Sequence, residues 1–354
     1  MHIERRAFLN SAMVEPVGCM TPGLRSNAAR CAIITAMNRR EFLFGAVAAS
    51  VGGGSMAAAN APEAVTQATP IAVGADGVKA EYHAFSRVFQ FLGDMHKAAD
   101  LLRSCGYDGV EWTARKGGFI DPATARLSDM KRAQAAAKAA GIKAESLIVD
   151  FLRGDDPGAE RIVMQAAEAG FRSFRGAYFR YDRAKTHREN MDAFRSGFDS
   201  LAALAEKSGM KCCYQNHSTY NKSVPLLGSL VWDLASVVSN YDPRTIGIQY
   251  DPMHVRAEGG PSWDHTLGAV AKWIDIVCLK DFHFALDASG RDWKRVLVPA
   301  GNGIVDFAEV KRLMALEGVA PRFTVHYDYD FPEDEVGARR FAASDLRHYR
   351  SVFG

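Results

Sequence analysis

The chain has 354 residues, of which 48% are hydrophobic and 24% are charged, and its formal net charge is +2. This composition is typical of a globular protein and excludes a disordered, fibrous or coiled-coil chain. Because the charges nearly cancel and no run of about 18 apolar residues occurs, we expect neither a nucleic-acid partner nor a membrane-spanning helix.

The first 79 residues have the features of an export leader followed by a tether. Arg39 and Arg40 precede a run of small and apolar residues (44–51), and an Ala-x-Ala cleavage pattern ends at Ala59. These are the parts of a secretory signal peptide, and Arg-Arg-x-Phe-Leu resembles the twin-arginine signal that exports folded proteins. We therefore predict a periplasmic or secreted protein with these segments: an extension upstream of the true start (1–36), a signal peptide (37–59), a flexible linker (60–79) and a folded domain (80–354).

Within the folded domain, short apolar runs alternate with longer amphipathic stretches. The strand candidates are residues 82–85, 109–113, 144–149, 173–177, 211–216, 246–250, 276–279 and 323–326. The helix candidates are residues 94–105, 124–140, 157–169, 187–208, 230–239, 263–273, 306–317 and 336–352. Eight strand–helix units predict an α/β fold, a single-domain (β/α)8 TIM barrel. A doubly wound open sheet is the alternative, but it would usually carry a Gly-rich phosphate loop after its first strand, and residues 85–93 contain none.

Polar residues gather at the predicted C-terminal ends of the strands, where the active sites of such barrels lie. A buried His or Asp is costly unless it is paired, so this concentration predicts a polar pocket with acid–base or metal-binding capacity. The residues at these ends include Arg87, Glu111, Arg115, Glu145, Asp150, Arg175, Tyr178, Gln215, Asn216, His217, Asp251, His254, Lys280, Asp281, His283, His326 and Asp328.

Several of these residues also have a structural interpretation. Glu111 is either a catalytic group or an ion-pair partner of Arg115 or Arg175. Asp281 either binds substrate or caps the loop after the seventh strand, and Lys280 is either catalytic or solvated. Asp251 and His254 lie three residues apart, so both side chains can converge on one metal ion.

Five segments in fixed order resemble the sugar phosphate isomerase/epimerase family, the xylose-isomerase-like TIM barrels. They are Gly-Tyr-Asp-Gly-Val-Glu (106–111), Tyr-Gln-Asn-His-Ser (214–218), Gln-Tyr-Asp-Pro-Met-His (249–254), Leu-Lys-Asp-Phe (279–282) and Val-Pro-Ala-Gly-Asn-Gly-Ile-Val-Asp-Phe (298–307). The resemblance covers essentially all of residues 80–354 and extends to a branch that often carries export leaders. That branch has His-x-Glu-Tyr on the eighth strand, where this chain has Asp328 in place of Glu.

The resemblance also implies a divalent metal, held by ligands from the fifth to the eighth strand that are usually Glu, Asp, His and Glu. Asp251 stands at the sixth-strand position with His254 as its companion, whereas Gln215, Cys278 and His326 replace the other three ligands. The implied ligands are therefore Asp251, His254, Gln215 and His326. Soft ligands such as Cys and His would shift the preference from Mn²⁺ or Mg²⁺ toward Zn²⁺.

Proton transfer must then depend on other groups, because the neutral amide of Gln215 cannot act as a base. His217, His254 and His326 have an ordinary pKa suited to this task, and Lys280 can stabilise a developing oxyanion. The predicted catalytic residues are His217, His254, Lys280 and Glu111, and the predicted substrate-binding residues are Arg87, Arg115, Arg175, Asn216, Asp281 and Asp328.

Three functions remain open from the sequence, all with a small-molecule carbohydrate as partner. The first is an exported isomerase or epimerase that moves a proton next to a sugar carbonyl, with or without a divalent metal (Zn²⁺, Mn²⁺ or Mg²⁺). The second is a lyase or hydrolase of keto-glycosides, in which the same enolate chemistry expels a leaving group. The third is a sugar-binding barrel that has lost the reaction, as the replaced carboxylates suggest.

Overall fold

The computed structural model describes residues 79–219, 224–320 and 322–354. The predicted upstream extension (1–36), the signal peptide (37–59) and the linker as far as residue 78 lie outside the described residues. The predicted folded domain, by contrast, is described almost completely.

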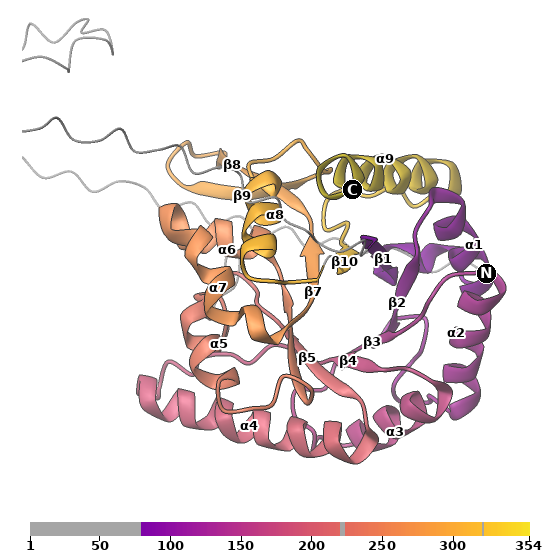
Figure 1. Ribbon diagram of the computed structural model, residues 1–354, viewed down its shortest axis with the longest axis horizontal. Coiled ribbons are helices and arrows are strands. Elements are labelled where there is room, and N and C mark those ends of the chain that lie inside the picture. The colour runs from indigo at the N-terminus through magenta and orange to yellow at the C-terminus, as the bar shows by residue number, and fades with distance from the viewer. Residues whose placement is uncertain (1–78, 220–223, 321) are drawn as a thin grey trace, which may run out of the picture. The chain divides into compact units, whose positions relative to one another are not determined.

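Eight parallel strands form a closed barrel in the order β1-β10-β7-β6-β5-β4-β3-β2, and Figure 1 shows the helices around them. The barrel closes through β1, since Ala84 lies beside Val110 of β2 on one side and Val325 of β10 on the other. Each strand overlaps one predicted strand, so the predicted TIM barrel is confirmed. The strands are β1 (Glu81–Phe85), β2 (Gly109–Ala114), β3 (Ser146–Val149), β4 (Ser173–Arg175), β5 (Lys211–Gln215), β6 (Ile246–Tyr250), β7 (Ile274–Leu279) and β10 (Arg322–Val325).

The helices pack outside the barrel, and their ends follow local signals. The longest begins after Thr186, whose hydroxyl accepts from the Glu189 amide while the Glu189 carboxylate accepts from the Thr186 amide. This capping box satisfies two amides that a helix leaves open, and Gly209, at φ 69°, ends the helix. The main helices are α1 (Met95–Cys105), α2 (Leu127–Ala139), α3 (Ala159–Ala169), α4 (His187–Ser208), α5 (Val231–Val238), α8 (Phe307–Leu316) and α9 (Glu335–Phe353).

The strands are buried from both sides. Every residue of β2, β3, β4 and β6 is buried, as expected for parallel strands that have side chains of the barrel interior on one face and helices on the other. Helix α1 shows the matching pattern, since its buried residues include Met95, Ala98 and Leu102. We call the C-terminal ends of the strands the mouth of the barrel and the N-terminal ends the base.

The structure differs from the prediction around the sixth and seventh strands. The predicted helix at 263–273 consists of 3-10 turns η2 (Gly260–His265) and η3 (Ala271–Trp273) around a short α7 (Thr266–Val270). A helix that was not predicted, α6 (Pro252–Gly259), begins directly after β6 because Asp251 caps it and Pro252 fits the first turn.

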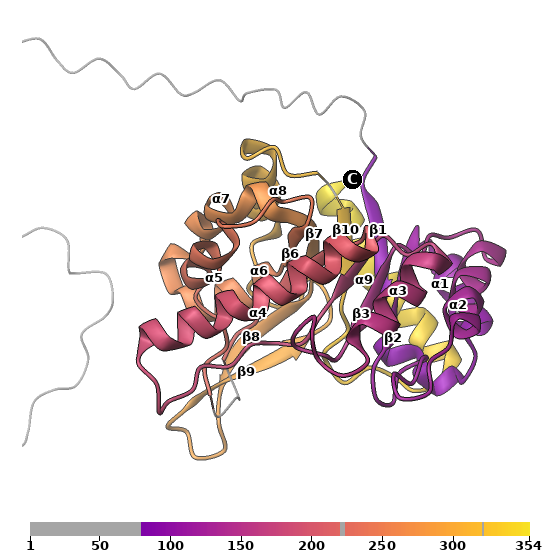
Figure 2. The ribbon, with the colours of Figure 1, turned by 90° about the horizontal axis from the view of Figure 1, so that it is seen from below.

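A further difference lies after β7, where residues 280–306 were predicted as a loop. They include an antiparallel hairpin of β8 (Asp281–Leu286) and β9 (Trp293–Val298), in which His283 lies opposite Val296. Figure 2 shows the hairpin extending from the side of the barrel at which the strands end. A 3-10 helix, η1 (Ser86–Leu92), follows β1 and was also missed. No helix in the described part of the chain is long and apolar enough to cross a membrane.

Candidate active site

The barrel brings together most of the predicted site residues at its mouth. Gln215 ends β5, Asp251 follows β6, Lys280 follows β7, and His326 follows β10. All four side chains are buried, with at most 3% of the residue exposed. A TIM barrel places the ends of consecutive strands side by side, which explains why residues far apart in the chain meet here.

A lysine lies at the centre of this group. The Lys280 Nζ is 3.1 Å from Asp251 Oδ2 and 2.8 Å from Asp328 Oδ2. Burial alone would lower the pKa of Lys280, but the two carboxylates raise it above its ordinary value. Burial alone would raise the pKa of Asp328, but Lys280 and His326 hold it below the ordinary range. The mouth therefore holds a buried ammonium between the carboxylates of Asp251 and Asp328, which excludes the solvated alternative for Lys280.

Asn216 fixes the position of Asp251. The Asn216 side-chain Nδ2 donates to the Asp251 backbone carbonyl at 3.0 Å, and the Asn216 Oδ1 accepts from the Asp251 backbone N–H at 2.7 Å. Asp251 Oδ1 accepts from the backbone amides of Met253 and His254, at 3.1 and 3.2 Å, as the cap of α6. One carboxylate oxygen thus holds a helix while the other faces Lys280. The predicted substrate-binding residue Asn216 acts in this structure on the backbone of its neighbour.

Gln215 connects Asp251 to the other side of the mouth. Its amide nitrogen donates to Asp251 Oδ2 at 2.8 Å, and its amide oxygen accepts from the Tyr178 hydroxyl at 2.7 Å. The Tyr178 hydroxyl in turn accepts from Arg175 at 2.9 Å. A continuous chain of hydrogen bonds therefore runs from β4 across β5 to Lys280.

Two histidines, His217 and His254, pack against each other beside the lysine, with ring centres 3.8 Å apart and ring planes tilted by 36°. The His217 Nδ1 lies 2.9 Å from the Ser218 carbonyl, which can only accept, so Nδ1 carries the proton and Nε2 has a free electron pair. The His254 Nδ1 lies 3.0 Å from the Arg295 guanidinium, which can only donate, so His254 in its neutral form carries its proton on Nε2. The two rings are thus an acceptor and a donor.

Both rings are neutral at neutral pH. Burial and the charge of Lys280 lower the pKa of His217 to about 3. Burial, His217 and Lys280 lower the pKa of His254 well below its ordinary value. The His254 Nε2 lies 3.5 Å from Asp251 Oδ2, beyond a good hydrogen bond, and has no hydrogen-bond partner among the described residues. This donor is therefore available to a ligand.

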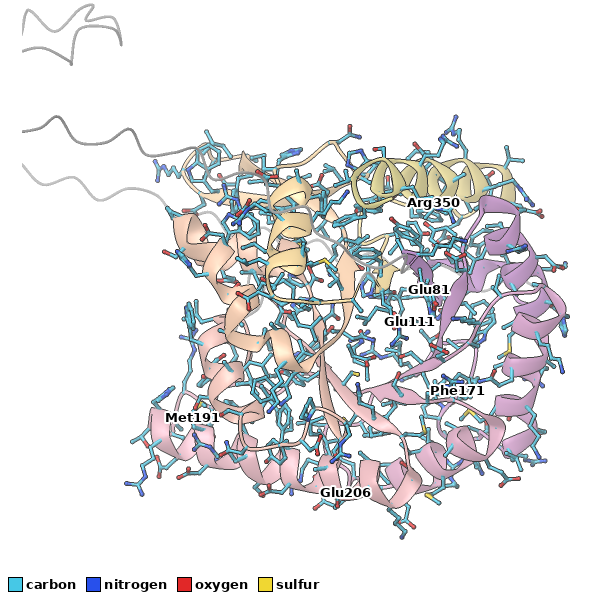
Figure 3. The ribbon with its side chains drawn as sticks, in the orientation of Figure 1. Glu81, Glu111, Phe171, Met191, Glu206 and Arg350 are labelled. Atoms are coloured by element: carbon cyan, nitrogen blue, oxygen red, sulfur yellow. The ribbon has the colours of Figure 1, made fainter. Side chains whose placement is uncertain are left out.

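Glu111 lies inside the ring of strands (Figure 3) and is wholly buried. Its carboxylate accepts from Gln249 at 2.8 Å and from Thr324 at 2.6 Å, and it lies 3.8 Å from the His326 Nε2. Burial alone would raise the pKa of Glu111, but His326 and Thr324 lower it to about 2. No salt bridge to Arg115 or Arg175 is found within the described residues. Glu111 therefore lies beside the ring of His326 and forms no ion pair with a described guanidinium group.

The predicted arginines lie on the β1–β4 side of the mouth. Arg87 follows β1 and is exposed, Arg115 follows β2, and Arg175 ends β4 and is 1% exposed. Arg115 donates to the Val149 carbonyl at 3.1 Å, and burial and Arg175 lower its pKa to about 10. The guanidinium groups of these arginines lie beside the cluster at the mouth and form no ion pair with Asp251, Asp328 or Glu111 among the described residues.

For Asp281, the structure favours the structural alternative over substrate binding. Its carboxylate accepts from the backbone amides of Gly301 and Gly303, at 3.2 and 3.0 Å, and from that of Val305 at 3.2 Å. A Cβ at Gly303 would overlap this carboxylate, which explains why glycine stands there. Asp281 holds the 301–305 loop. Glu145 also lies elsewhere than expected, since it precedes β3 and belongs to the base.

The four implied metal ligands do not fit a divalent cation as they are arranged. The Lys280 ammonium already lies between Asp251 and Asp328, and Gln215 directs an N–H toward Asp251. Among residues 79–219, 224–320 and 322–354, the one group of three His, Cys, Asp or Glu side chains close enough to share an ion is Glu81, His83 and Glu145 at the base. Metal assistance at the mouth therefore stays a prediction.

Sequence analysis missed three contributors to the mouth. Ser218 lies 2.9 Å from the His254 Nδ1, and Arg295 of β9 donates to both Ser218 and His254. Tyr178 was noticed at a strand end but was given no role. The Gln-Asn-His-Ser segment could have indicated Ser218, whereas Arg295 gave no signal because the hairpin that carries it was not predicted.

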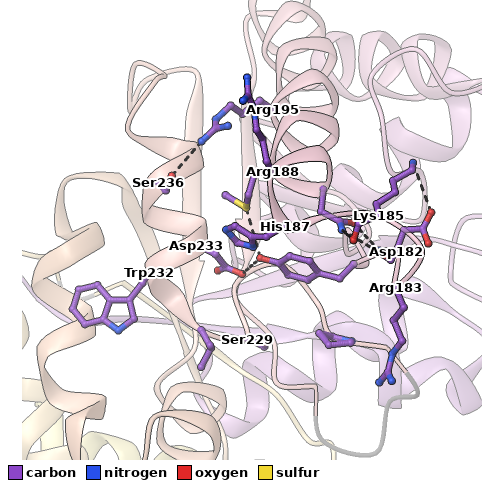
Figure 4. Close-up of a pocket in the computed structure, with 15 residues that line it drawn as sticks. Asp182, Arg183, Lys185, His187, Arg188, Arg195, Ser229, Trp232, Asp233 and Ser236 are labelled. Carbon is purple, nitrogen blue, oxygen red and sulfur yellow. Dashed lines mark hydrogen bonds and ion pairs between the residues drawn. The ribbon is translucent and has the colours of Figure 1, made fainter.

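A hollow of about 880 Å³ lies elsewhere, between the start of α4 and α5 (Figure 4). Tyr181 and the exposed Trp232 are among its lining residues, and the Tyr181 hydroxyl donates to Asp233 at 2.7 Å. None of the predicted site residues lines this groove. The candidate chemistry therefore lies at the mouth and not in the larger hollow.

Comparisons with known proteins agree with the barrel fold. The sequence profile of the xylose isomerase-like TIM barrel family matches residues 99–343. The chain belongs to this family. No curated protein sequence matches the chain significantly.

Solved structures of xylose isomerase-like barrels are similar to the chain at low sequence identity. The apo form of a 3-keto-D-glucoside 4-epimerase, YcjR, from E. coli has 14% identity and a TM-score of 0.58, over 77% of this chain and 100% of that one. A D-psicose 3-epimerase with D-tagatose from Clostridium cellulolyticum H10 has 14% identity and a TM-score of 0.55, over 77% and 99%. A xylose isomerase-like TIM barrel protein from Mycobacterium smegmatis in complex with magnesium has 13% identity and a TM-score of 0.54, over 78% of this chain and 98% of that one. At these identities the likeness establishes a shared fold.

Proposed function

We propose that the protein is a carbohydrate isomerase or epimerase that moves a proton next to a sugar carbonyl. The observation that carries this proposal is the pair of neutral histidines, one an acceptor and one a donor, beside the Lys280 ammonium. The names of similar structures, a 3-keto-D-glucoside 4-epimerase and a D-psicose 3-epimerase, support the same class of reaction.

The reaction begins with loss of a proton from the carbon next to the carbonyl. The free electron pair on the His217 Nε2 takes this proton, the C–H electrons form a carbon–carbon double bond, and the carbonyl electrons move to oxygen. The Lys280 ammonium stabilises the negative charge that develops on that oxygen, because a cation held in a buried site requires little rearrangement during the reaction. His254 donates its Nε2 proton in a hydrogen bond to a substrate oxygen.

The proton then returns to carbon from His217, or from solvent in exchange with it. Protonation of the same carbon from the opposite face, by solvent, re-forms the carbonyl and gives an epimer. For an isomer, the hydroxyl group on that carbon passes its proton to the oxyanion, its electrons form the new carbonyl, and the double-bond electrons take a proton at the former carbonyl carbon. The low pKa of His217 keeps the ring neutral, with a free electron pair, at neutral pH, and it also makes the ring a weaker base than a histidine of ordinary pKa. In this scheme Glu111 acts through His326 as a positioning residue, and the positive charge comes from Lys280.

Solvent deuterium exchange tests the proposal directly. D-psicose, D-tagatose, D-fructose and 3-keto-glucose are incubated with the mature protein in D₂O, with and without Mn²⁺, Co²⁺ and Zn²⁺, and analysed by NMR. We expect deuterium at a carbon next to the carbonyl, and a rate at least about 100-fold lower for His217→Gln. No exchange across this panel under any metal condition would contradict the proposal.

A keto-glycoside lyase or hydrolase is the second candidate, favoured by the 3-keto-glucoside named for one similar structure. The same enolate would expel the group attached two carbons from the carbonyl. Incubation with a 3-keto-glucoside separates the two functions, because a lyase or hydrolase releases the aglycone and an epimerase leaves the glycosidic bond intact.

We also propose export to the periplasm through a twin-arginine signal. The support is the Arg39–Arg40 pair, the apolar run and the cleavage pattern before residue 60. N-terminal sequencing of protein from the periplasmic fraction should give Asn60 as the first residue. Retention of Arg39→Lys, Arg40→Lys protein in the cytoplasm would support export by this route, and unchanged export would contradict it.

A further inference from the structure

The β1–β4 side of the mouth contains a second hollow with an excess of positive charge. Arg87, Arg115 and Lys116 line this hollow of about 420 Å³, and Asp150 is the one acidic residue among its lining side chains. The Asp150 carboxylate already accepts from the Lys116 backbone amide at 3.2 Å. The hollow therefore has two guanidinium groups and an ammonium against one carboxylate.

Arg175 adds a buried cation next to this hollow. It is 1% exposed, and its Nε has no hydrogen-bond partner among the described residues. The carboxylate of Glu111 raises the pKa of Arg175 but already accepts hydrogen bonds from Gln249 and Thr324. Burial and the nearby charge of Arg175 lower the pKa of Arg115 to about 10, which agrees with like charges held close together.

The charged hollow is connected to the proposed reaction centre. Arg175 donates to the Tyr178 hydroxyl at 2.9 Å, and Tyr178 donates to Gln215 at 2.7 Å. Gln215 donates to Asp251 at 2.8 Å, and Asp251 lies 3.1 Å from Lys280. Three polar side chains, Tyr178, Gln215 and Asp251, therefore connect Arg175 to Lys280 at the proposed oxyanion site.

We propose that the substrate carries an anionic group, a carboxylate or a phosphate, which Arg115 and Arg175 bind while Arg87 attracts it at the rim. The planar guanidinium group binds both anions through paired N–H donors, and a buried unpaired donor gains more from such a partner than an exposed one. This inference rests on the proposed function, because it names the substrate class of the same site. It makes a sugar acid or a sugar phosphate a better ligand than a neutral sugar of the same skeleton.

Calorimetric titration of the mature protein with D-glucose, D-glucuronate and D-glucose 6-phosphate tests this inference without requiring turnover. We expect at least one of the two anionic sugars to bind about tenfold more tightly than glucose, and the preference to fall as NaCl rises. The anion that binds more tightly identifies the source of the charge as carboxylate or phosphate.

Matched variants locate the site. Arg115→Gln should abolish the preference for the anionic sugar, and the exposed Arg87→Gln should reduce it about threefold. The control is Arg172→Gln, an arginine at the base whose side chain is 80% exposed and pairs with Glu145, which should leave the preference unchanged. Circular dichroism shows whether each variant is folded.

Equal affinity for all three sugars, or a preference that survives Arg115→Gln, would overturn this inference. The two proposals fail separately. Deuterium exchange on neutral sugars that Arg115→Gln leaves unchanged would disprove the anionic substrate and keep the isomerase. Tight, arginine-dependent binding of glucuronate without exchange into any ketose or keto acid would disprove the isomerase and keep the anion site.

Discussion

The mouth and the base of the barrel each combine histidine, carboxylate and lysine side chains, yet these groups are paired differently. At the base, Glu81 lies 2.5 Å from the His83 Nε2 and 2.6 Å from Lys143, while Arg322 holds Glu145 at 2.9 Å. The Lys143 side chain is 55% exposed. The cations of the base therefore reach in from solvent and neutralise carboxylates that are partly solvated.

At the mouth the charges are buried and the pairing is incomplete. The Lys280 side chain is 3% exposed and that of Asp251 is not exposed at all. The Nε2 atoms of His254 and His326 have no hydrogen-bond partner in the described part of the chain. Buried groups that are left unsatisfied destabilise a fold, and they commonly occur where a ligand completes them. The Nδ1 atom of His83 at the base also has no partner among the described residues, so the two ends differ mainly in the burial of their charged pairs.

The largest difference between the two ends is expected from removal of their lysines. Lys280→Met leaves Asp251 buried without its cation, so we expect a loss of about 3 kcal/mol in the free energy of unfolding and at least a 100-fold lower exchange rate, both order-of-magnitude values. Lys143→Met, the matched control at the base, should cost about 1 kcal/mol or less and leave the rate unchanged. Urea unfolding measures the free energy of unfolding of both variants, and deuterium exchange into the sugar measures their rates. Equal losses for the two variants would remove the distinction between the ends.

The next effect is the pH dependence of stability that His217 causes. Its pKa is about 3 in the folded protein, against about 6.5 in the unfolded chain. As the pH falls below 6.5, His217 is protonated in the unfolded chain but stays neutral in the folded protein. The folded state is therefore progressively destabilised between pH 6.5 and pH 3. We expect up to about 2 kcal/mol of this loss between pH 6.5 and 5.

Urea unfolding at pH 7, 6 and 5 measures this loss, which should be smaller in His217→Gln. The control is His265→Gln, whose side chain is 81% exposed and which should follow the native protein. If the free energy of unfolding changes with pH equally in the native protein and in His217→Gln, His217 is not the source of the pH dependence.

A smaller effect is expected from the hydroxyl group that connects the two sides of the mouth. Tyr178→Phe leaves the buried amide oxygen of Gln215 without its donor and should weaken sugar binding by about 1 kcal/mol. Because Tyr178 is a positioning residue in this account, KM should change more than kcat. Tyr82→Phe is the control, since the Tyr82 hydroxyl donates to the Gly354 carbonyl far from the mouth. Loss of affinity in both variants would indicate a general packing effect.

The smallest effect is expected from metal removal. Because Lys280 already supplies a cation at the mouth, dialysis against EDTA should leave the exchange rate unchanged, and elemental analysis of the mature protein should find less than one Mn²⁺, Zn²⁺ or Mg²⁺ per chain. One ion per chain that disappears in Asp251→Ala would instead place a metal at the mouth. An ion that persists in Asp251→Ala and disappears in Glu145→Gln would place it at the base.

Local sequence patterns were enough to predict the barrel fold and the strand ends at which chemistry is expected. Apolar runs that alternate with amphipathic stretches predicted all eight strands of the barrel, and the helix predicted at 187–208 has the same bounds as α4. These features are local, since periodicity and capping depend on residues a few positions apart. They also placed Asp251, Lys280 and His326 at the same end of the barrel.

The tertiary structure was needed to show which of these groups pair and which of them are charged. The contacts of Lys280 with Asp251 and Asp328, and of Arg295 with His254, join segments that no local pattern relates. The β8–β9 hairpin and the break in the predicted helix at 263–273 were also missed. The physical reason is that the charge of a buried group depends on the neighbours that barrel closure brings to it, and those neighbours are distant in the chain.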